Sequence, residues 1–292
     1  MRNTYARNRV SILVYHDPQP SVLDKHLTYL AKHYRFISLD RLVAAIRLDD
    51  WATIPPKSLV VTLDDGYRGN FELLAVFAKH SLVPTIYLST QIVATRRHYW
   101  WTFEADSQHL KRVPNSARIR ILSEKYGFKQ TTEYEQHDRQ SLSAEEITLM
   151  RDAVDFGAHS RFHPILPMCA ADECRQEIVV SKEEVETLAR KPCHHFSYPN
   201  GSYGHREVEM VREAGYASAR TTDVGWNSSN TDVFRLKAIE VSDDASINRL
   251  AANLTGIASP VSLASRVALA AARGRDAACG RAELSGCSES SM

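Results

Sequence analysis

The sequence predicts an α/β fold in which short parallel strands alternate with helices. Apolar or β-branched runs at 10–15, 58–63 and 84–89 are typical of strands, and segments with apolar residues at helical spacing lie between them. The run 58–63 lacks polar alternation, as expected of a parallel strand covered on both faces. Polar clusters directly follow several of the runs. Because parallel sheets and barrels carry their active sites at the carboxyl ends of the strands, we expect the functional site there.

Helix starts are marked at three positions. Ser21 and Asp40 are expected to act as N-caps, and Ser143 with Glu146 has the spacing of a capping box. We expect further strands over 36–39, 156–159, 194–198 and 216–219, and helices over 21–34, 40–46, 69–80, 143–153, 172–190 and 204–214.

The organisation of the chain is expected to be one domain over residues 1–256, followed by a C-terminal helix and flexible tail over 257–292. Segment 90–140 is less regular and is interpreted as an insertion or a long loop on the substrate side. After about residue 256 the chain becomes rich in Ala, Ser, Gly and Arg, and a helix around 261–272 is expected there.

Charge and composition narrow the class of protein. The 36 Lys and Arg residues nearly balance the 35 Asp and Glu residues, which argues against nucleic-acid binding. No run approaches the roughly 18 apolar residues of a membrane span. The five cysteines form no C-x-x-C pair, and Cys169 and Cys174 lack the second pair of a zinc ribbon. We therefore expect free thiols in a reducing compartment.

The N-terminus bears on the location. Residues 1–9 are basic, like the start of a signal peptide, but the apolar stretch 10–15 is too short to follow as its hydrophobic region. This predicts a cytoplasmic protein, although a chain trimmed of its signal peptide would look the same.

Asp64, Asp65 and Gly66 directly follow the run 58–63. Adjacent carboxylates repel each other and are costly to desolvate, so a strand end that presents two of them usually needs a cation nearby. Gly66 allows the sharp turn that would bring both to one site. Taken alone, Asp-Asp-Gly is also a common turn sequence.

His159 and His163 form a second polar cluster. Histidines four apart lie on one face of a helical turn, so both imidazoles can reach one metal ion. Two histidines and one carboxylate, with an open position, are a typical ligand set of catalytic zinc. With 12 histidines in the chain this spacing can arise by chance. Its combination with the paired aspartates is the stronger indication.

Three segments carry a resemblance to a known family. Residues 62–67 (T-L-D-D-G-Y) resemble the T-F-D-D-G signature of the polysaccharide deacetylase family, also called the NodB homology domain or carbohydrate esterase family 4. Residues 159–164 (H-S-R-F-H-P) resemble its H-[ST]-x-x-H metal motif, and residues 196–201 (F-S-Y-P-N-G) resemble its third motif. The order and separations agree, and the likeness runs from about residue 10 to 241.

The resemblance implies a fold, a metal site and a reaction. The fold would be a distorted (β/α)7-type barrel. Asp65, His159 and His163 would bind one divalent metal, zinc in the first place and cobalt or nickel as alternatives. Asp64 would be the general base. The reaction implied is removal of N-acetyl groups from amino sugars of a poly- or oligosaccharide or glycolipid, with release of acetate.

The third motif departs from the family pattern. It often reads R-x-P-Y, with an arginine that orients the base and a tyrosine whose backbone N–H binds the oxyanion, and Ser197 and Asn200 occupy these positions here. The Asn200 N–H can keep the oxyanion role, with Tyr198 and Pro199 beside it, whereas the orienting arginine is absent. A D-x-x-D-W tether is also absent, although residues 223–226 (D-V-G-W) fall in a comparable region.

His16 is the candidate general acid. In the family this histidine normally ends the last strand in a pattern like I-x-L-x-H, but residues 236–241 contain no histidine, whereas residues 12–16 (I-L-V-Y-H) have that shape. We infer a circular permutation, in which the first strand of this chain takes the place of the family's last strand. Some exopolysaccharide deacetylases of the family look permuted in this way. A capping or core histidine is the alternative for His16.

Aromatic residues are the remaining candidates. Trp100 and Trp101, next to Tyr99, can form a platform for a sugar ring or belong to the core. Tyr67 and Tyr198 flank motifs and are candidates for lining the groove. His194 and His195 begin a strand, at the end away from the expected site, and are interpreted as structural.

Two rival functions stay open. One is a metal-dependent amidase acting on a small non-sugar amide. The other is an inactive carbohydrate-binding domain, which the missing arginine and tether would favour.

Overall fold

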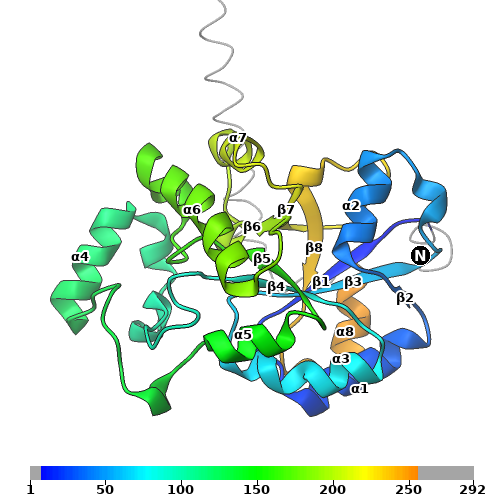
Figure 1. Cartoon of the computed structure of the whole chain (residues 1–292), viewed down its shortest axis with the longest axis horizontal. Coiled ribbons are helices and arrows are strands. Elements are labelled where there is room, and N and C mark those ends of the chain that lie inside the picture. Colours follow the sequence, from blue (N-terminus) through cyan, green and yellow to red (C-terminus); the bar gives the residue numbers. More distant parts are fainter. Residues whose placement is uncertain (1–7, 256–292) are drawn as a thin grey trace, which may run out of the picture. The chain divides into compact units, whose positions relative to one another are not determined.

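Seven parallel strands close into a barrel in the computed structural model, which describes residues 8–255 (Figure 1). Each strand pairs with the next around the ring, and β3 pairs with β1 to close it. A two-residue strand, β2 (Arg35–Phe36), pairs with the beginning of β3. The predicted (β/α)7-type barrel is thus confirmed. The barrel strands, in their order around the ring, are β1 (Ser11–Tyr15), β8 (Leu236–Glu240), β7 (Ser218–Val224), β6 (His195–Ser197), β5 (Asp155–Ala158), β4 (Thr85–Leu88) and β3 (Ser58–Leu63).

The first strand of the chain lies between β3 and the last strand. All five residues of β1 pair with β3, from Ser11 with Leu59 to Tyr15 with Leu63, and Leu13 pairs with Ile239 of β8. This is the place that the inferred circular permutation predicts for β1. It also brings the residue after β1, His16, to the same end of the barrel as the residues after β3.

Helices surround the strands, and α4 lies at the left edge of the view in Figure 1. They follow from amphipathic sequence: in α1, Leu23, Leu27 and Leu30 are spaced at three and four residues and are fully buried. The helices are α1 (Pro20–Ala31), α2 (Leu39–Arg47), α3 (Leu74–Lys79), α4 (Asn115–Tyr126), α5 (Ala144–Met150), α6 (Ala171–Ala189), α7 (His205–Glu213) and α8 (Ile247–Asn253).

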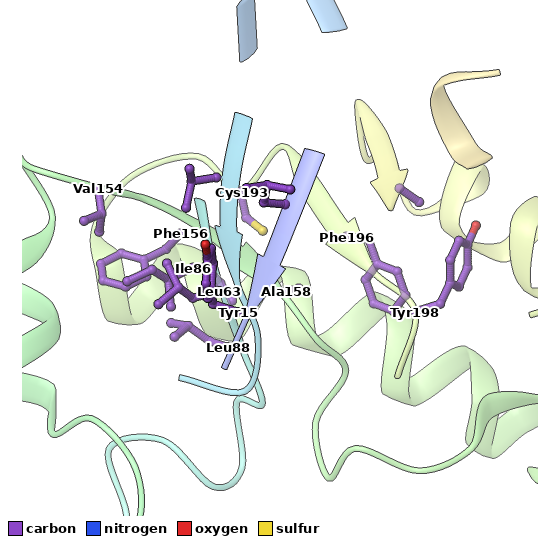
Figure 2. Packing of buried hydrophobic residues seen from close by; sticks show 14 of the residues in the cluster. Tyr15, Leu63, Ile86, Leu88, Val154, Phe156, Ala158, Cys193, Phe196 and Tyr198 are labelled. Carbon is purple, nitrogen blue, oxygen red and sulfur yellow. The ribbon is translucent and has the colours of Figure 1, made fainter. Parts of the chain in front are cut away.

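The core explains why the strands lack polar alternation. Leu13 and Tyr15 of β1 belong to one buried cluster, whereas Ile12 and Val14, on the opposite face of the strand, belong to another. Figure 2 shows part of the larger cluster, with side chains from neighbouring strands packed together, such as Ile86 beside Phe156. Both faces of the strands are therefore covered by apolar side chains.

Several predicted boundaries need correction. Helix α1 starts at Pro20 rather than after Ser21, because proline suits the first turn, where no N–H bond is lost. Helix α2 is capped by Ser38, whose hydroxyl accepts the Arg41 N–H, so Asp40 lies in the first turn and is not the cap. The capping box of Ser143 and Glu146 is confirmed.

Two predicted segments have a different secondary structure. The helix expected over 69–80 begins as a 3₁₀ segment at Arg68–Leu73 and becomes α-helical only at α3. The 3₁₀ segment buries Asn70, whose side-chain amide donates to the His16 carbonyl. The insertion 90–140 contains helix α4 and three short 3₁₀ turns, so it is more regular than the sequence suggests. Its residues Trp100, Leu110, Leu122 and Phe128 form a small apolar cluster together with Ile165, which lies after the insertion.

Cys169, Cys174 and Cys193 are buried free thiols, as predicted. Cys279, Cys287 and the helix expected around 261–272 lie outside the described residues. Across residues 8–255, no helix combines the length and the apolar character that crossing a membrane requires.

Candidate metal centre and active site

A pocket of about 250 Å³ opens at the carboxyl ends of the barrel strands. It brings together five residues that were predicted from the sequence and that come from three distant segments of the chain. Tyr67, Trp100, Trp101 and Asn200 line it as well. The five are His16, Asp64, Asp65, His159 and His163.

The turn after β3 directs both aspartates into this pocket. The Asp64 N–H donates to the Tyr15 carbonyl and extends the β1–β3 ladder. Asp65 (φ 73°) and Gly66 (φ 76°) then adopt left-handed conformations that reverse the chain. A Cβ at residue 66 would lie 2.8 Å from the side chains of Leu88 and Val93, so glycine is required there for space as well.

Asp65 and the two histidines have the arrangement of a metal site. Asp65 Oδ1 lies 3.6 Å from His159 Nε2 and 3.4 Å from His163 Nε2. One ligand atom from each residue lies within 4.8 Å of the other two. Asp65 Oδ1 is buried, and no donor among residues 8–255 hydrogen-bonds to it. A buried oxygen facing two imidazole nitrogens fits a divalent cation, which would supply the missing positive charge.

The metal loop, residues 159–163, is not the helical turn that the spacing suggested. Ser160 (φ 61°) and His163 (φ 53°) are left-handed, and the Ser160 hydroxyl accepts the His163 N–H at 3.1 Å. His159 Nδ1 is 2.7 Å from the Ser197 carbonyl, which leaves Nε2 available to a metal. Spacing alone could not separate the two conformations, because a tight loop also brings residues four apart together.

Burial controls the protonation of the three ligands. It lowers the pKa of His159 to about 4 and that of His163 well below its usual value, so both imidazoles are neutral near pH 7. Burial together with the charge of Asp64 raises the pKa of Asp65 to about 7. Neutral imidazole and an ionised carboxylate are the forms that bind metals.

The second aspartate is paired with an arginine that sequence analysis missed. The fully buried Arg220 of β7 donates to both carboxylate oxygens of Asp64 and to the Ser197 hydroxyl. Burial acts to raise the pKa of Asp64, but Arg220 and His159 outweigh it and hold that pKa below its usual value.

Arg220 corrects the expectation that the orienting arginine is absent. Ser197 stands at the arginine position of the third motif, and Arg220 is its direct partner in the β6–β7 ladder. The guanidinium therefore arrives from the neighbouring strand at the same level of the barrel. No local pattern marked Arg220, because the strand expected over 216–219 ended before it, whereas β7 runs from Ser218 to Val224.

His16 is held at the end of β1 by its backbone. Its N–H donates to Asp243 Oδ1 at 3.0 Å, and its carbonyl accepts from Asn70 at 2.8 Å. Burial lowers the pKa of His16, but nearby carboxylates, chiefly Asp65 and Asp64, outweigh this effect and raise that pKa above its usual value. The motif at 223–226 does not provide this hold: Asp223 accepts from the Tyr203 hydroxyl at 2.7 Å.

In the third motif, Asn200 lines the pocket, whereas Tyr198 and Pro199 do not. Asn200 (φ 56°) lines the pocket. Its main-chain N–H takes part in none of the main-chain hydrogen bonds of its turn, whereas the main-chain N–H groups of Gly201 and Ser202 do. Tyr198 is 1% exposed and donates to the Phe234 carbonyl. In the described structure, neither Tyr198 nor Pro199 is among the residues lining this pocket, so the expectation that Tyr198 lines the groove is corrected.

The two tryptophans have different surroundings. Trp100 is 3% exposed and donates its indole N–H to the His163 carbonyl at 2.9 Å. Trp101 is only partly buried, donates to the Tyr67 hydroxyl at 3.2 Å and packs edge-on against His163, with ring centroids 4.5 Å apart. Of the two, Trp101 is the better placed to contact a ligand.

Two further charged residues line the pocket without having been predicted. Lys111, from the insertion, donates to Asn200 Oδ1 at 2.7 Å. Glu240 ends β8, where it pairs with Val14 of β1. Neither belongs to a motif, so both became visible only when the fold brought them to the site.

Comparison with known proteins agrees with this geometry. Residues 52–219, more than half of the chain, match the sequence profile of the polysaccharide deacetylase family. The chain belongs to this family. Membership places the deacetylase among the hydrolases that act on carbon–nitrogen bonds. No curated protein sequence matches the chain.

Solved structures share the fold at low sequence identity. The deacetylase PplD of Streptococcus pyogenes, solved in complex with acetate, is 16% identical, with a TM-score of 0.61 over 84% of this chain and 97% of that chain. IcaB from Ammonifex degensii is 16% identical, with a TM-score of 0.60 over 84% and 96%. The BpsB deacetylase domain from Bordetella bronchiseptica is 14% identical, with a TM-score of 0.56 over 80% and 96%.

The raised pKa of Asp65 predicts pH-dependent stabilisation by metal. Its pKa rises from 3.8 to about 7 on folding, so ionising Asp65 destabilises the metal-free protein progressively as the pH rises from about 4 to 7. Zinc should therefore raise the melting temperature more at pH 8 than at pH 5.5, where a proton must first leave. Asp65→Asn should abolish this difference in thermal scans. Equal zinc shifts at both pH values in the wild type would contradict the prediction.

The buried ion pair predicts a large stability effect at Arg220. Arg220→Met would leave Asp64 buried without its counter-charge, which typically costs about 3–5 kcal/mol of unfolding free energy. The double variant Asp64→Asn with Arg220→Met should recover much of this loss, since it removes the charge as well. Urea denaturation at pH 7.5 measures both. A double variant no more stable than Arg220→Met would show that the pair is not the cause.

Proposed function

We propose that this deacetylase is a metal-dependent enzyme that removes N-acetyl groups from amino sugars of a poly- or oligosaccharide or a glycolipid, releasing acetate and a free amine. The observation that carries the proposal is the convergence of Asp65, His159 and His163 beside an aspartate held by Arg220. Family membership supports the reaction type. The structural similarity to PplD, whose structure contains acetate, agrees with it.

Asp65, His159 and His163 would hold the divalent ion, for which zinc is our first choice because two imidazoles and a carboxylate suit it. Cobalt and nickel suit the same ligands. When bound, such an ion polarises an acyl oxygen and lowers the pKa of water. His159 and His163 are neutral near pH 7, which favours binding.

Asp64 takes the proton of the attacking water as general base. Arg220 keeps Asp64 ionised and fixes the orientation of its carboxylate, both of which a base requires. The oxygen attacks the acetamide carbon, and the negative charge that develops on the acyl oxygen is stabilised by the N–H of Asn200. Losing one such donor typically costs about 2.7–4 kcal/mol in the transition state.

His16 donates the proton that the departing nitrogen needs when the carbon–nitrogen bond breaks. An amine is too basic to leave without it, so the donor must be protonated at the working pH. The carboxylates of Asp65 and Asp64 favour the protonated form of His16. Trp101 offers an aromatic surface for the apolar face of a sugar ring, and Lys111 a hydrogen-bond donor for its hydroxyl groups.

The rival functions are tested by substrate choice and by turnover. An amidase for small amides would hydrolyse acetamide derivatives in preference to N-acetylglucosamine oligomers. An inactive sugar-binding domain would bind the oligomers without releasing acetate. The inactive domain was favoured by the missing arginine and the missing tether, and Arg220 removes the first of these arguments.

Asp64→Asn is the decisive variant. It keeps the shape of the side chain but removes the base, so acetate release from N-acetylglucosamine oligomers by the zinc-loaded enzyme should fall about 10²- to 10⁴-fold. Asp40→Asn is the matched control, because Asp40 pairs with His195 at the start of β6, away from the pocket, and should leave the rate unchanged. Wild-type rates for Asp64→Asn would exclude the proposed mechanism.

Glu240→Gln should move the alkaline limb of the pH–rate profile. Glu240 helps to raise the pKa of His16, so removing its charge lowers that pKa and His16 loses its proton at a lower pH. The fall of kcat/KM with rising pH should therefore begin at a lower pH than in the wild type. Glu184→Gln, outside the pocket, serves as the control. An alkaline limb that stays in place, or moves to higher pH, would argue against His16 as the acid.

A further inference from the structure

The metal loop has a backbone that needs external support. Ser160 and His163 are left-handed although both carry a Cβ, a conformation that L-residues rarely adopt without help from their surroundings. Three residues, Ser160, Arg161 and Phe162, lie between the histidines in the sequence, and the amides of Arg161 and Phe162 point to the same side of the loop. Their orientation decides how the two imidazoles are presented to Asp65.

Both amides donate to one buried carboxylate. Glu177 Oε2, on helix α6, accepts the Arg161 N–H at 2.7 Å and the Phe162 N–H at 2.9 Å. Glu177 is only 6% exposed. Burying a carboxyl group is unfavourable unless donors compensate it. Burial raises the pKa of Glu177 to about 7, and the two main-chain donors act against this rise. These contacts therefore fix the loop and the glutamate together.

The carbonyl side of the loop is held by other backbone groups. The Thr90 N–H donates to the Ser160 carbonyl at 3.1 Å and the Gln91 N–H to the Arg161 carbonyl at 2.9 Å. These bonds do not involve the amides of Arg161 and Phe162, so those two amides depend on Glu177, whereas the His163 N–H donates to the Ser160 hydroxyl. Glu177 itself is not among the residues that line the pocket.

A second glutamate of α6 provides a natural comparison. Glu184 also contacts the loop, but through the Arg161 side chain, and it further accepts from Thr90 and Gln91 side chains. It belongs to the same helix and is part-buried, yet it accepts no main-chain N–H of the metal loop in the described structure. Variants of Glu177 therefore test the hydrogen bonds to the loop backbone, whereas variants of Glu184 test the side-chain contacts that attach the loop to α6.

We propose that Glu177 is a positioning residue that sets the metal affinity of the Asp65, His159 and His163 site by fixing the backbone between the two histidines. The inference rests on the proposed metal site. It assigns Glu177 a role beyond general stability, because the loop conformation decides whether both imidazoles face the carboxylate of Asp65.

The test is the zinc dissociation constant, measured by competition with a chromogenic chelator at a temperature where circular dichroism shows each variant folded. Glu177→Ala should bind zinc about 10- to 100-fold more weakly, as is typical when a partner that orients metal ligands is lost. Glu177→Gln keeps an oxygen acceptor and should restore near-wild-type affinity. Glu184→Ala, the matched control, should also bind like the wild type.

The possible outcomes distinguish this inference from the proposed function. A wild-type protein that does not bind zinc would refute the metal site itself. Wild-type affinity in Glu177→Ala, or equal losses in Glu177→Ala and Glu184→Ala, would overturn the role of Glu177 while leaving the metal site intact. If Glu177→Ala does not fold, Glu177→Asp replaces it, because its shorter side chain cannot reach both amides. Equal affinity of the Asp, Gln and wild-type proteins would then overturn the inference.

Discussion

Two adjacent carboxyl groups are buried at the end of β3, and the rest of the site depends on how their charge is balanced. Asp64 receives a permanent counter-charge from Arg220 and stays ionised. Asp65 has no such partner and faces His159 and His163. In the same buried environment, the pKa of Asp64 is therefore lowered and that of Asp65 is raised. Only Asp65 still needs a cation to balance its charge. This division separates the proposed base from the proposed metal ligand.

In the barrel, the counter-charge of Asp64 can come from more than one strand. Ser197 and Arg220 are partners across the β6–β7 ladder, so side chains from either position reach the same level of the interior. Arg220 therefore reaches Asp64 from β7, although the arginine of the family's third motif would stand on β6. In the same way, His16 reaches the site from β1 because β1 occupies the gap between β3 and β8. Position around the ring matters more for the site than position along the chain.

Sequence reasoning was sufficient for the features that are local. The strands are apolar runs, and Asp64, Asp65 and His159 follow them closely, so the parallel strands and the place of the site could be predicted from local patterns. The closed barrel and the set of metal ligands were predicted from the resemblance to the deacetylase family. Arg220, Asp243 and Lys111 could not be predicted, because each acts across a strand pairing or a long loop that no local pattern specifies. Helix α4 was missed because it buries the polar residues Asn115 and Arg118, which obscures its apolar face. The left-handed loop between the histidines was missed because spacing does not determine backbone dihedral angles.

The position of β1 also has a consequence for the order of assembly. During synthesis β1 leaves the ribosome before the other barrel strands, and its partner β3 follows soon after, but its other neighbour, β8, appears only when most of the barrel has been made. Contacts that join the two ends of a chain form slowly, because a long loop must be closed before they are gained. Asp243, which binds the His16 amide, comes later still. The His16 N–H therefore gains its partner late, and a nascent chain stalled before β8 would contain the metal ligands while His16 was held only by β3 and Asn70.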